Sequence, residues 1–122
     1  MPTWTPDDLA ELERDHEIRV AGRRADGSLR TLTIVWQVVV DGALYVRSYK
    51  GAEGQWYRGA LRHLEGAISW NDVTRRVAFI PDDTRDDAVD DAYFAKYGDT
   101  GPTRAMVAPA AAATTLRVEP RD

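Results

Sequence analysis

One stretch of this 122-residue chain constrains its fold more than any other: Leu29–Val40, which reads LRTLTIVWQVVV. Most of its residues are β-branched or aromatic, and this composition is typical of a β-strand. We expect one face of the strand to carry Leu32, Ile34, Trp36, Val38 and Val40, and the other to carry Val35 and Val39 beside Thr31, Thr33 and Gln37. Because both faces are largely apolar, the strand suits the wall of a barrel better than an open sheet.

Short elements surround this strand. Asp41-Gly42 is a strong signal for a two-residue hairpin, after which Leu44–Tyr49 returns antiparallel. Thr5 and Pro6 predict a helix start, because threonine caps helices and proline suits the first helical position. The other expected elements are the strands Glu17–Ala21, Ala67–Trp70, Arg75–Ile80 and Thr114–Val118, the turn Ala25–Ser28, the loop Gly51–Gly54 and the helix Gln55–His63.

A longer helix is predicted over Pro81–Gly98, where Thr84 and Asp87 have the spacing of a capping box. One face of it carries Val89, Ala92, Tyr93, Lys96 and Tyr97. Its many aspartates, Asp82 to Asp91, are interpreted as a solvated helix N-terminus rather than a metal site. The segment Ala110–Ala113 fits either a turn of helix or a loop.

Together these elements predict an α+β fold: a small split-barrel-like domain of about six mainly antiparallel strands with two or three helices. Residues 1–122 suffice for one domain with a hydrophobic core. The chain has no cysteine, which excludes disulfides and thiolate chemistry.

Composition argues against nucleic acid and membranes as partners. A net charge of −4 argues against a general nucleic-acid binder, which needs a basic surface. No apolar run is long enough to span a bilayer, and the N-terminus lacks the basic and apolar regions of a signal peptide. We therefore expect a cytoplasmic protein that binds a small molecule.

Three cationic clusters are candidates for an anion-binding site. Arg23, Arg24 and Arg30 flank the Ala25–Ser28 turn, and guanidinium groups bind phosphate oxygens in pairs of hydrogen bonds. The alternative interpretation is a solvated hairpin tip that carries surface arginines.

The second cluster is Ser48-Tyr49-Lys50-Gly51, where a hydroxyl, an ammonium and a glycine N–H end a strand. An ordinary exit from a strand explains it equally well. The third cluster is Trp56-Tyr57-Arg58, at a helix N-terminus that favours anions. Its aromatic rings could stack on a heterocycle or simply anchor the helix to the barrel.

The histidines carry no recognisable chemistry. His16 and His63 are not spaced for metal binding, and neither stands in a nucleophile–base pattern. We expect both to be exposed residues at helix ends, and we expect no metal site in the protein.

The ordered set Gly22-Arg23-Arg24, long strand, Asp-Gly, Ser48-x-x-Gly51 and Trp56-Tyr57 resembles deazaflavin-dependent nitroreductase-like proteins of actinobacteria. These belong to the split β-barrel superfamily of flavin-type binders, within which the chain is most similar to the uncharacterised domain-of-unknown-function family 2255. The likeness covers Ile18–Ile80 and, more weakly, Thr114–Pro120.

The resemblance implies a cofactor, FMN or the deazaflavin cofactor, and a set of residues that hold it. Arg23 and Arg24 would hold its phosphate and acidic tail, while Thr33 and Val35, or Ile34 and Trp36, would line its ring. The remaining cofactor-binding candidates are Ser48, Lys50, Gly51, Trp56, Tyr57 and Arg58.

The function that this resemblance implies is an oxidoreductase that transfers a hydride between the cofactor and a small organic substrate. No side chain is obligatory as acid or base, although Tyr49 or Tyr57 could donate a proton. The alternative function is a ligand-binding or interaction domain that kept the barrel and lost redox activity. A homodimer is an expectation at the level of the superfamily.

Overall fold

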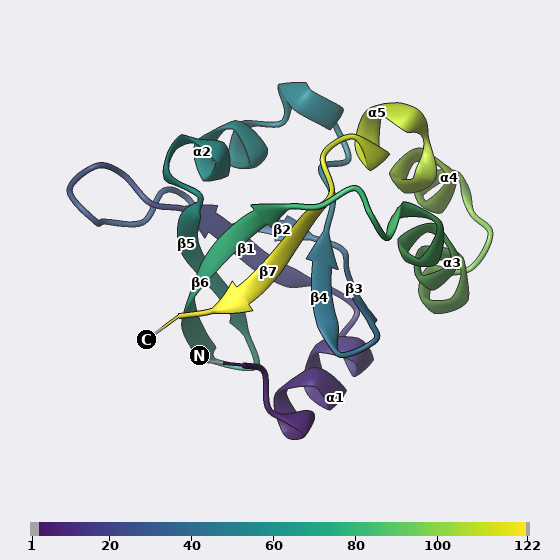
Figure 1. The fold of residues 1–122 in the computed structure, drawn as a ribbon, viewed down its shortest axis with the longest axis horizontal. Coiled ribbons are helices and arrows are strands. Elements are labelled where there is room, and N and C mark those ends of the chain that lie inside the picture. Colours follow the sequence, from purple (N-terminus) through teal and green to yellow (C-terminus); the bar gives the residue numbers. More distant parts are fainter. Residues whose placement is uncertain (1–2, 122) are drawn as a thin grey trace.

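The computed structural model describes residues 3–121 and contains one antiparallel sheet of seven strands curled into a nearly closed barrel (Figure 1). The strand order is β2-β1-β5-β6-β7-β4-β3. The strands are β1 (Ile18–Gly22), β2 (Thr33–Val35), β3 (Gln37–Val40), β4 (Ala43–Val46), β5 (Glu65–Trp70), β6 (Val73–Pro81) and β7 (Leu116–Pro120). This arrangement confirms the predicted fold class, with one strand more than expected.

The helices lie outside the barrel in three places. They are α1 (Pro6–Arg14), the 3-10 turn η1 (Gly51–Glu53), α2 (Gln55–His63), α3 (Asp86–Tyr97), α4 (Gly101–Val107) and α5 (Pro109–Ala112). In Figure 1, α1 lies at one end of the barrel, α2 lies near the other, and α3, α4 and α5 form a group beside β3 and β4. Residues 109–112 are thus helical, which decides between the two alternatives for the alanine-rich segment.

The long predicted strand is divided at Trp36, and this accounts for the additional strand. Before the break, β2 pairs with β1, where Val35 lies opposite Ile18. After it, β3 pairs with β4, where Gln37 lies opposite Val46. Because the chain passes from one end of the sheet to the other at Trp36, the break nearly closes the barrel.

The predicted apolar face is therefore wrong on the N-terminal side of the break. Val38 and Val40 are buried as expected, but Ile34 is 53% exposed and Leu32 is 36% exposed. Val35, expected on the opposite face, is buried instead. The physical reason is that the two halves have different neighbouring strands, so a period of two does not continue through Trp36.

Local turn and cap signals gave mixed results. Asp41 and Gly42 form the predicted hairpin, with φ of 49° and 80°. Thr5 caps α1: its Oγ1 accepts a hydrogen bond from the Asp8 backbone N–H at 3.0 Å. The capping box predicted for the longer helix is wrong, because α3 begins only at Asp86 and its N-cap residue, Arg85, makes no side-chain cap bond.

Two other boundaries differ for local reasons. Thr84 donates its backbone N–H and its hydroxyl to Asp82 Oδ1, at 2.9 and 2.6 Å, and so forms a turn before the helix. Pro81 ends β6 rather than starting a helix. The segment expected as a loop at Gly51–Gly54 contains the short helix η1, and Gly51 has a φ of 65°.

Apolar side chains gather in two clusters. The first fills the barrel and includes Ile18, Val20, Leu44, Val46, Ile68, Val77, Phe79, Leu116 and Val118. The second lies between the β3–β4 hairpin and the helices α3 and α4, and contains Val38, Val40, Tyr45, Val89, Tyr93 and Met106. The second cluster attaches α3 and α4 to the barrel wall, and the buried Val89 and Tyr93 confirm the predicted face of α3.

Close backbone contact positions α2. A Cβ atom added to Gly22 would lie 2.7 Å from the backbone of Gly59 and Ala60, and one added to Gly66 would lie 1.9 Å from the carbonyl oxygen of Ala21. Only glycine allows β5, β1 and α2 to approach so closely. These contacts fix the middle of α2 against β1. Within residues 3–121, no helix combines the length and the apolar character needed to cross a membrane.

Candidate functional site

An apolar cleft of about 270 Å³ opens where the barrel wall is divided at Trp36. Its walls come from the β2–β3 break, the end of β4, and the helices α2 and α4. The lining residues are Ile34, Val35, Trp36, Arg47, Tyr49, Trp56, Pro102 and Met106.

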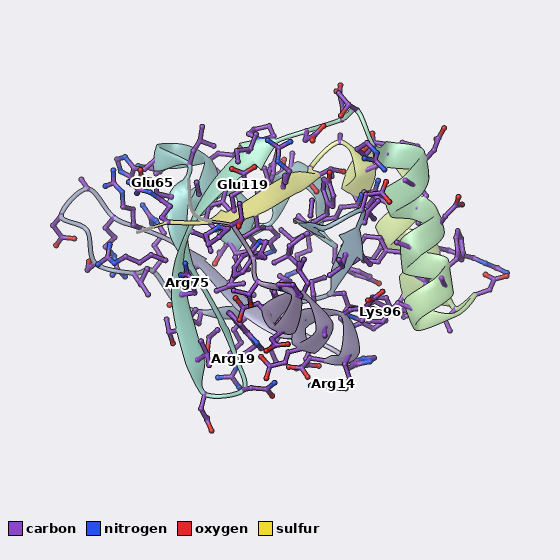
Figure 2. All side chains as sticks on the ribbon, turned by 60° about the horizontal axis from the view of Figure 1, so that its bottom comes forward. Arg14, Arg19, Glu65, Arg75, Lys96 and Glu119 are labelled. Carbon is purple, nitrogen blue, oxygen red and sulfur yellow. The ribbon has the colours of Figure 1, made fainter. Side chains whose placement is uncertain are left out.

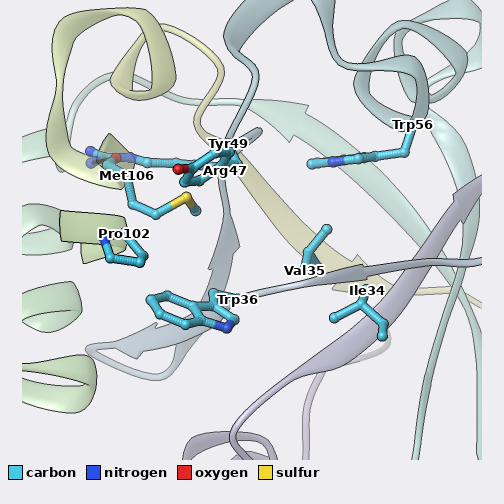
Figure 3. A pocket seen from close by; sticks show the side chains of 8 residues that line it. All are labelled: Ile34, Val35, Trp36, Arg47, Tyr49, Trp56, Pro102 and Met106. Atoms are coloured by element: carbon cyan, nitrogen blue, oxygen red, sulfur yellow. Dashed lines mark hydrogen bonds between the residues drawn. The ribbon is translucent and has the colours of Figure 1, made fainter. Parts of the chain in front are cut away.

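Aromatic rings lie on both sides of this apolar cleft. Figure 3 shows Trp56 and Tyr49 along one side, and Trp36 with Ile34 along the other. Tyr49 is 61% exposed, so its ring is available at the mouth of the cleft. Two facing aromatic surfaces with aliphatic side chains between them suit a flat, conjugated ring.

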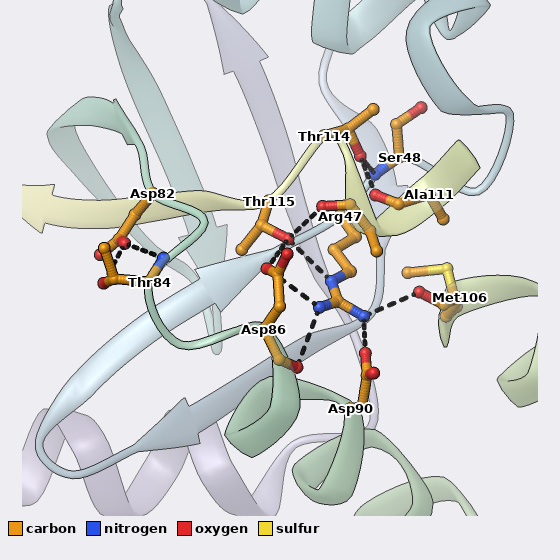
Figure 4. A network of polar contacts seen from close by, with 11 residues as sticks. Arg47, Ser48, Asp82, Thr84, Asp86, Asp90, Met106, Ala111, Thr114 and Thr115 are labelled. Carbon is orange, nitrogen blue, oxygen red and sulfur yellow. Dashed lines mark hydrogen bonds and ion pairs between the residues drawn. The ribbon is translucent and has the colours of Figure 1, made fainter. Parts of the chain in front are cut away.

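Arg47 also lines the cleft, and its side chain is completely buried (Figure 4). Its guanidinium donates to Asp90 Oδ1 at 2.5 Å, to Thr115 Oγ1 at 2.9 Å and to the Met106 carbonyl at 3.1 Å. It also donates to the backbone carbonyl and the carboxylate of Asp86, at 3.3 and 3.4 Å. Arg47 thus connects β4 with α3, α4 and β7.

This network corrects the interpretation of the aspartate run as a solvated helix start. Asp86 and Asp90 each have a side chain that is 33% exposed, and both face the buried guanidinium of Arg47. The expectation that the run holds no metal stays a prediction, although no group of three potential ligands suited to a metal ion occurs among the described residues.

The break at Trp36 is held from outside by α3. Tyr93 Oη donates to the Trp36 carbonyl at 2.8 Å, and Lys96 Nζ donates to the carbonyls of Leu12 and Gln37 at 3.2 and 3.1 Å. Lys96 lies where α3 faces α1 (Figure 2). Burial lowers the pKa of Lys96 to about 8, because a desolvated ammonium is less stable than a hydrated one. Burial also raises the pKa of the Tyr93 hydroxyl.

Two polar clefts continue from the apolar one over α2. The second cleft, of about 190 Å³, shares Trp56 with the first and is lined also by Gly22, Arg24, Arg30, Thr31, Thr33 and Gln55. The third, of about 530 Å³, shares Arg30 and Gln55 with the second and is lined also by Arg58, Gly59, Leu61 and Arg62. Because they share lining residues, the three clefts are neighbours, and we refer to them together as the groove.

The polar part of the groove is cationic. Arg24, Arg30, Arg58 and Arg62 line it, and none of these four forms an ion pair with a carboxylate in the described chain. The Nε atom of Arg30 is buried and has no hydrogen-bond partner. No side chain caps the N-terminus of α2, which begins at this same place. Positive charge and free backbone N–H groups together favour a bound anion.

Three of the predicted cofactor-binding residues line this groove: Arg24, Trp56 and Arg58. The first basic cluster is divided, because Arg23 Nε donates to Glu65 Oε1 at 2.8 Å while Arg24 donates only to Ser28 and to the Leu29 carbonyl. The hydrogen bond from Arg23 lowers the pKa of Glu65.

The other predicted residues lie outside the three clefts. Ser48 is buried, and its Oγ lies so close to Gly54 that an added Cβ there would be 2.2 Å away. Lys50 is exposed and Gly51 is buried. Tyr57 packs against the barrel core and meets the Trp56 ring edge-on at 6.0 Å. His16 and His63 are exposed, as expected.

Several lining residues were not singled out from the sequence. Arg62 follows Arg58 by four positions on a predicted helix, and this spacing could have identified it. Pro102 and Met106 belong to α4, a helix that was not predicted, so no local signal pointed to them. Of the two alternatives for the ring-lining face, Ile34, Val35 and Trp36 all line the apolar cleft, because the strand breaks there.

A sequence model of the family described as "Uncharacterized protein conserved in bacteria (DUF2255)" matches residues 8–118. The chain therefore belongs to this family, as predicted. No curated protein sequence is significantly similar to it.

Solved structures share its fold. A conserved hypothetical protein, Rv2991 of Mycobacterium tuberculosis, is 18% identical with a TM-score of 0.58, over 96% of this chain and 79% of that one. A protein described as F420 reductase is 21% identical with a TM-score of 0.57, over 93% and 92% of the two chains. ChuZ of Campylobacter jejuni is 11% identical with a TM-score of 0.59; the match covers 94% of this chain but only half of ChuZ.

Proposed function

We propose that this member of the DUF2255 family binds a flavin-type cofactor and acts as an oxidoreductase on a small organic substrate. The cofactor ring would occupy the apolar cleft, and its anionic groups would lie on the cationic clefts over α2. The observation that carries this proposal is that the clefts are adjacent: Trp56 lines both the apolar cleft and the first cationic cleft.

The apolar cleft supplies ring binding rather than acid–base chemistry. Its lining contains one charged residue, Arg47, and that guanidinium is already bonded to Asp90. Trp36 and Trp56 would enclose the ring. When bound, the reduced cofactor supplies the hydride, and the protein supplies binding and orientation.

Tyr49 is the side chain proposed to donate a proton to the substrate. Its phenol is the one hydroxyl group among the residues that line the apolar cleft. Tyr57, the other tyrosine considered from the sequence, packs on the barrel core instead. Phenol-to-substrate donation would complete a hydride reduction without any carboxylate or histidine.

The length of the cationic groove favours the deazaflavin cofactor over FMN. FMN carries a single phosphate, and Arg24 with Arg30 in the second cleft suffices for it. The groove continues past these residues to Arg58 and Arg62. This extension suits a ligand whose phosphate is followed by an acidic tail.

The proposal extends to location and assembly. We place the protein in the cytoplasm, with a small molecule rather than nucleic acid as its ligand. A homodimer would cover Ile34 and Tyr49, two side chains that line the cleft and are 53% and 61% exposed.

The alternative function is a binding module without turnover. The same groove supports it, because nothing in the groove's chemistry requires that the bound ring be reduced. The two proposals differ in one observable: only the oxidoreductase consumes reduced cofactor when a small acceptor is added.

Titration of FMN and of the deazaflavin cofactor, followed by fluorescence quenching, tests the proposed function. We expect the wild type to bind the deazaflavin cofactor more tightly than FMN. Trp56→Leu should weaken both by about tenfold, because stacking on one aromatic ring contributes about 1–3 kcal/mol. The control is Tyr49→Phe, which keeps its aromatic ring. Trp70→Leu would not serve, because Trp70 belongs to the hydrophobic core. Absence of binding to both cofactors by the wild type would contradict the proposal.

A further inference from the structure

We infer that Tyr97 is a positioning residue for the ligand ring, because it fixes the ring of Trp36 from the side opposite the apolar cleft. The part of this inference that concerns ligand affinity rests on the proposed function. The part that concerns Trp36 itself does not.

The two rings form a parallel stack. The centroids of Trp36 and Tyr97 are 4.1 Å apart, and the ring planes differ by 3°. His16 meets both rings edge-on, at 5.3 Å from each. Trp36 lines the apolar cleft and Tyr97 does not, so Tyr97 covers one face of the indole and leaves the other for a ligand.

The ring of Trp36 depends on this stack because the backbone offers it no cross-strand partner. Residue 36 lies between β2 and β3 and belongs to neither ladder. Its carbonyl is fixed by the Tyr93 hydroxyl, but a carbonyl bond does not determine the plane of the indole. In an ordinary strand, side chains on both neighbouring strands would hold the ring in place.

Tyr97 is itself held firmly. Its hydroxyl lies 2.9 Å from the His16 carbonyl and 2.8 Å from the Gln37 carbonyl, so its single proton is shared between these two acceptors. Burial raises the pKa of this hydroxyl still further above neutral pH. The Lys96 ammonium lies 5.2 Å from the centroid of the Tyr97 ring. The tyrosine is thereby anchored both to the end of α1 and to the start of β3.

A bound ring would therefore be the third member of a stack. Its orientation would follow the indole plane, which follows the Tyr97 plane. Loss of the tyrosine ring should release the indole and weaken ring binding, while the cationic clefts, which Tyr97 does not line, should be unaffected.

The first experiment needs no ligand. Protein labelled with 5-fluorotryptophan would be examined by fluorine NMR, with Trp36→Phe used to assign the Trp36 signal. We expect a shifted and broadened Trp36 signal in Tyr97→Leu, and a nearly unchanged one in Tyr97→Phe, which keeps the stack. Phe94→Leu is the matched control, because Phe94 is a 37% exposed aromatic residue on the same helix. An unchanged Trp36 signal in Tyr97→Leu would overturn the inference.

The second experiment is a double-mutant cycle for FMN binding. Tyr97→Leu should weaken FMN about threefold to tenfold, the range for loss of an aromatic pair. In the Trp36→Leu background the same change should have no further effect, because Tyr97 acts only through Trp36. Equal weakening in both backgrounds would contradict the inference. If wild type binds no ring at all, the proposed function fails while the NMR result still decides the role of Tyr97.

Discussion

Arg47 and the four arginines of the groove are the same residue type in opposite situations. Arg47 is completely buried and is bonded to the side chains of Asp86, Asp90 and Thr115 and to two backbone carbonyls. The groove arginines are Arg24, Arg30, Arg58 and Arg62, and none of them has a carboxylate partner in the part of the chain described. The protein neutralises the first cation itself, whereas the other four have no carboxylate partner among the described residues and are the ones we propose for an external anion.

Internal partners distinguish a structural cation from a candidate for ligand binding. Burial of a charge is tolerated when partners within the protein complete its hydrogen bonds, and removing it then costs stability. Clustered cations without such partners repel one another, and a bound anion relieves this repulsion. Substitutions in the first group should therefore change folding, and substitutions in the second should change binding.

The largest expected effect is on the structural side. Arg47→Met should lower the free energy of unfolding by about 3 kcal/mol or more, because Asp86 and Asp90 would lose the cation that they face. Urea denaturation followed by circular dichroism measures this. Arg76→Met is the control, since Arg76 is exposed on β6. Equal urea midpoints for the two variants would show that Arg47 is not a structural cation.

Neighbouring aspartates give the second test. Asp90→Asn should destabilise the protein by about 1–3 kcal/mol, because it removes a charged hydrogen bond to a buried guanidinium. Asp91→Asn should have little effect, because Asp91 is exposed on the same helix. The interpretation of the run as a solvated helix start predicts equally small effects for both, so urea midpoints distinguish the two accounts.

On the binding side, Arg24→Ala and Arg58→Ala should each weaken the deazaflavin cofactor about tenfold and leave the urea midpoint unchanged. The loss should shrink as salt is added, because the groove is open to solvent. The sequence-based hypothesis predicts similar weakening for Lys50→Ala, whereas the cleft geometry predicts little, because Lys50 lines none of the three clefts. Isothermal titration of the three variants decides between them.

The smallest expected effect, on the pH dependence of stability, concerns Lys96. This half-buried cation is bonded to carbonyls and is thus intermediate between Arg47 and the groove arginines. Its pKa falls from 10.5 to about 8 in the folded protein, so the unfolded chain binds more protons between these values. Stability should therefore rise as the pH increases from about 8 to about 10.5. Lys96→Met should abolish this rise, and a rise that persists in the variant would assign it to other groups.

The features that the sequence could predict are local. The Asp41-Gly42 hairpin and the Thr5 cap depend on residues within one turn of each other, and both are present. The break at Trp36 was missed because it arises from a change of strand partner. The alternation of apolar and polar residues in Leu29–Val40 gives no sign of that change. The helix α4 was missed for a related reason, because a seven-residue helix depends on tertiary packing more than on its own propensity.

The sequence could predict the type of candidate site, a cationic cleft beside aromatic rings, but not which arginines line it. Adjacent residues Arg23 and Arg24 look alike in the sequence, yet only Arg23 meets Glu65, which is 42 positions away. Arg47 likewise meets acids on α3 that are 39 and 43 positions away. Whether a cation is neutralised within the protein is thus decided by distant partners, and the sequence pattern cannot show it.

A comparison of FMN with riboflavin, which carries the same ring without the phosphate, tests directly whether the groove arginines bind a phosphate. Both affinities would be measured at low ionic strength in the wild type and in Arg24→Ala. We predict that the wild type binds FMN about tenfold more tightly than riboflavin, and that Arg24→Ala loses most of this difference while its riboflavin affinity is unchanged. Equal affinity of the wild type for both flavins would contradict the account, because the groove cations would then contribute nothing to binding.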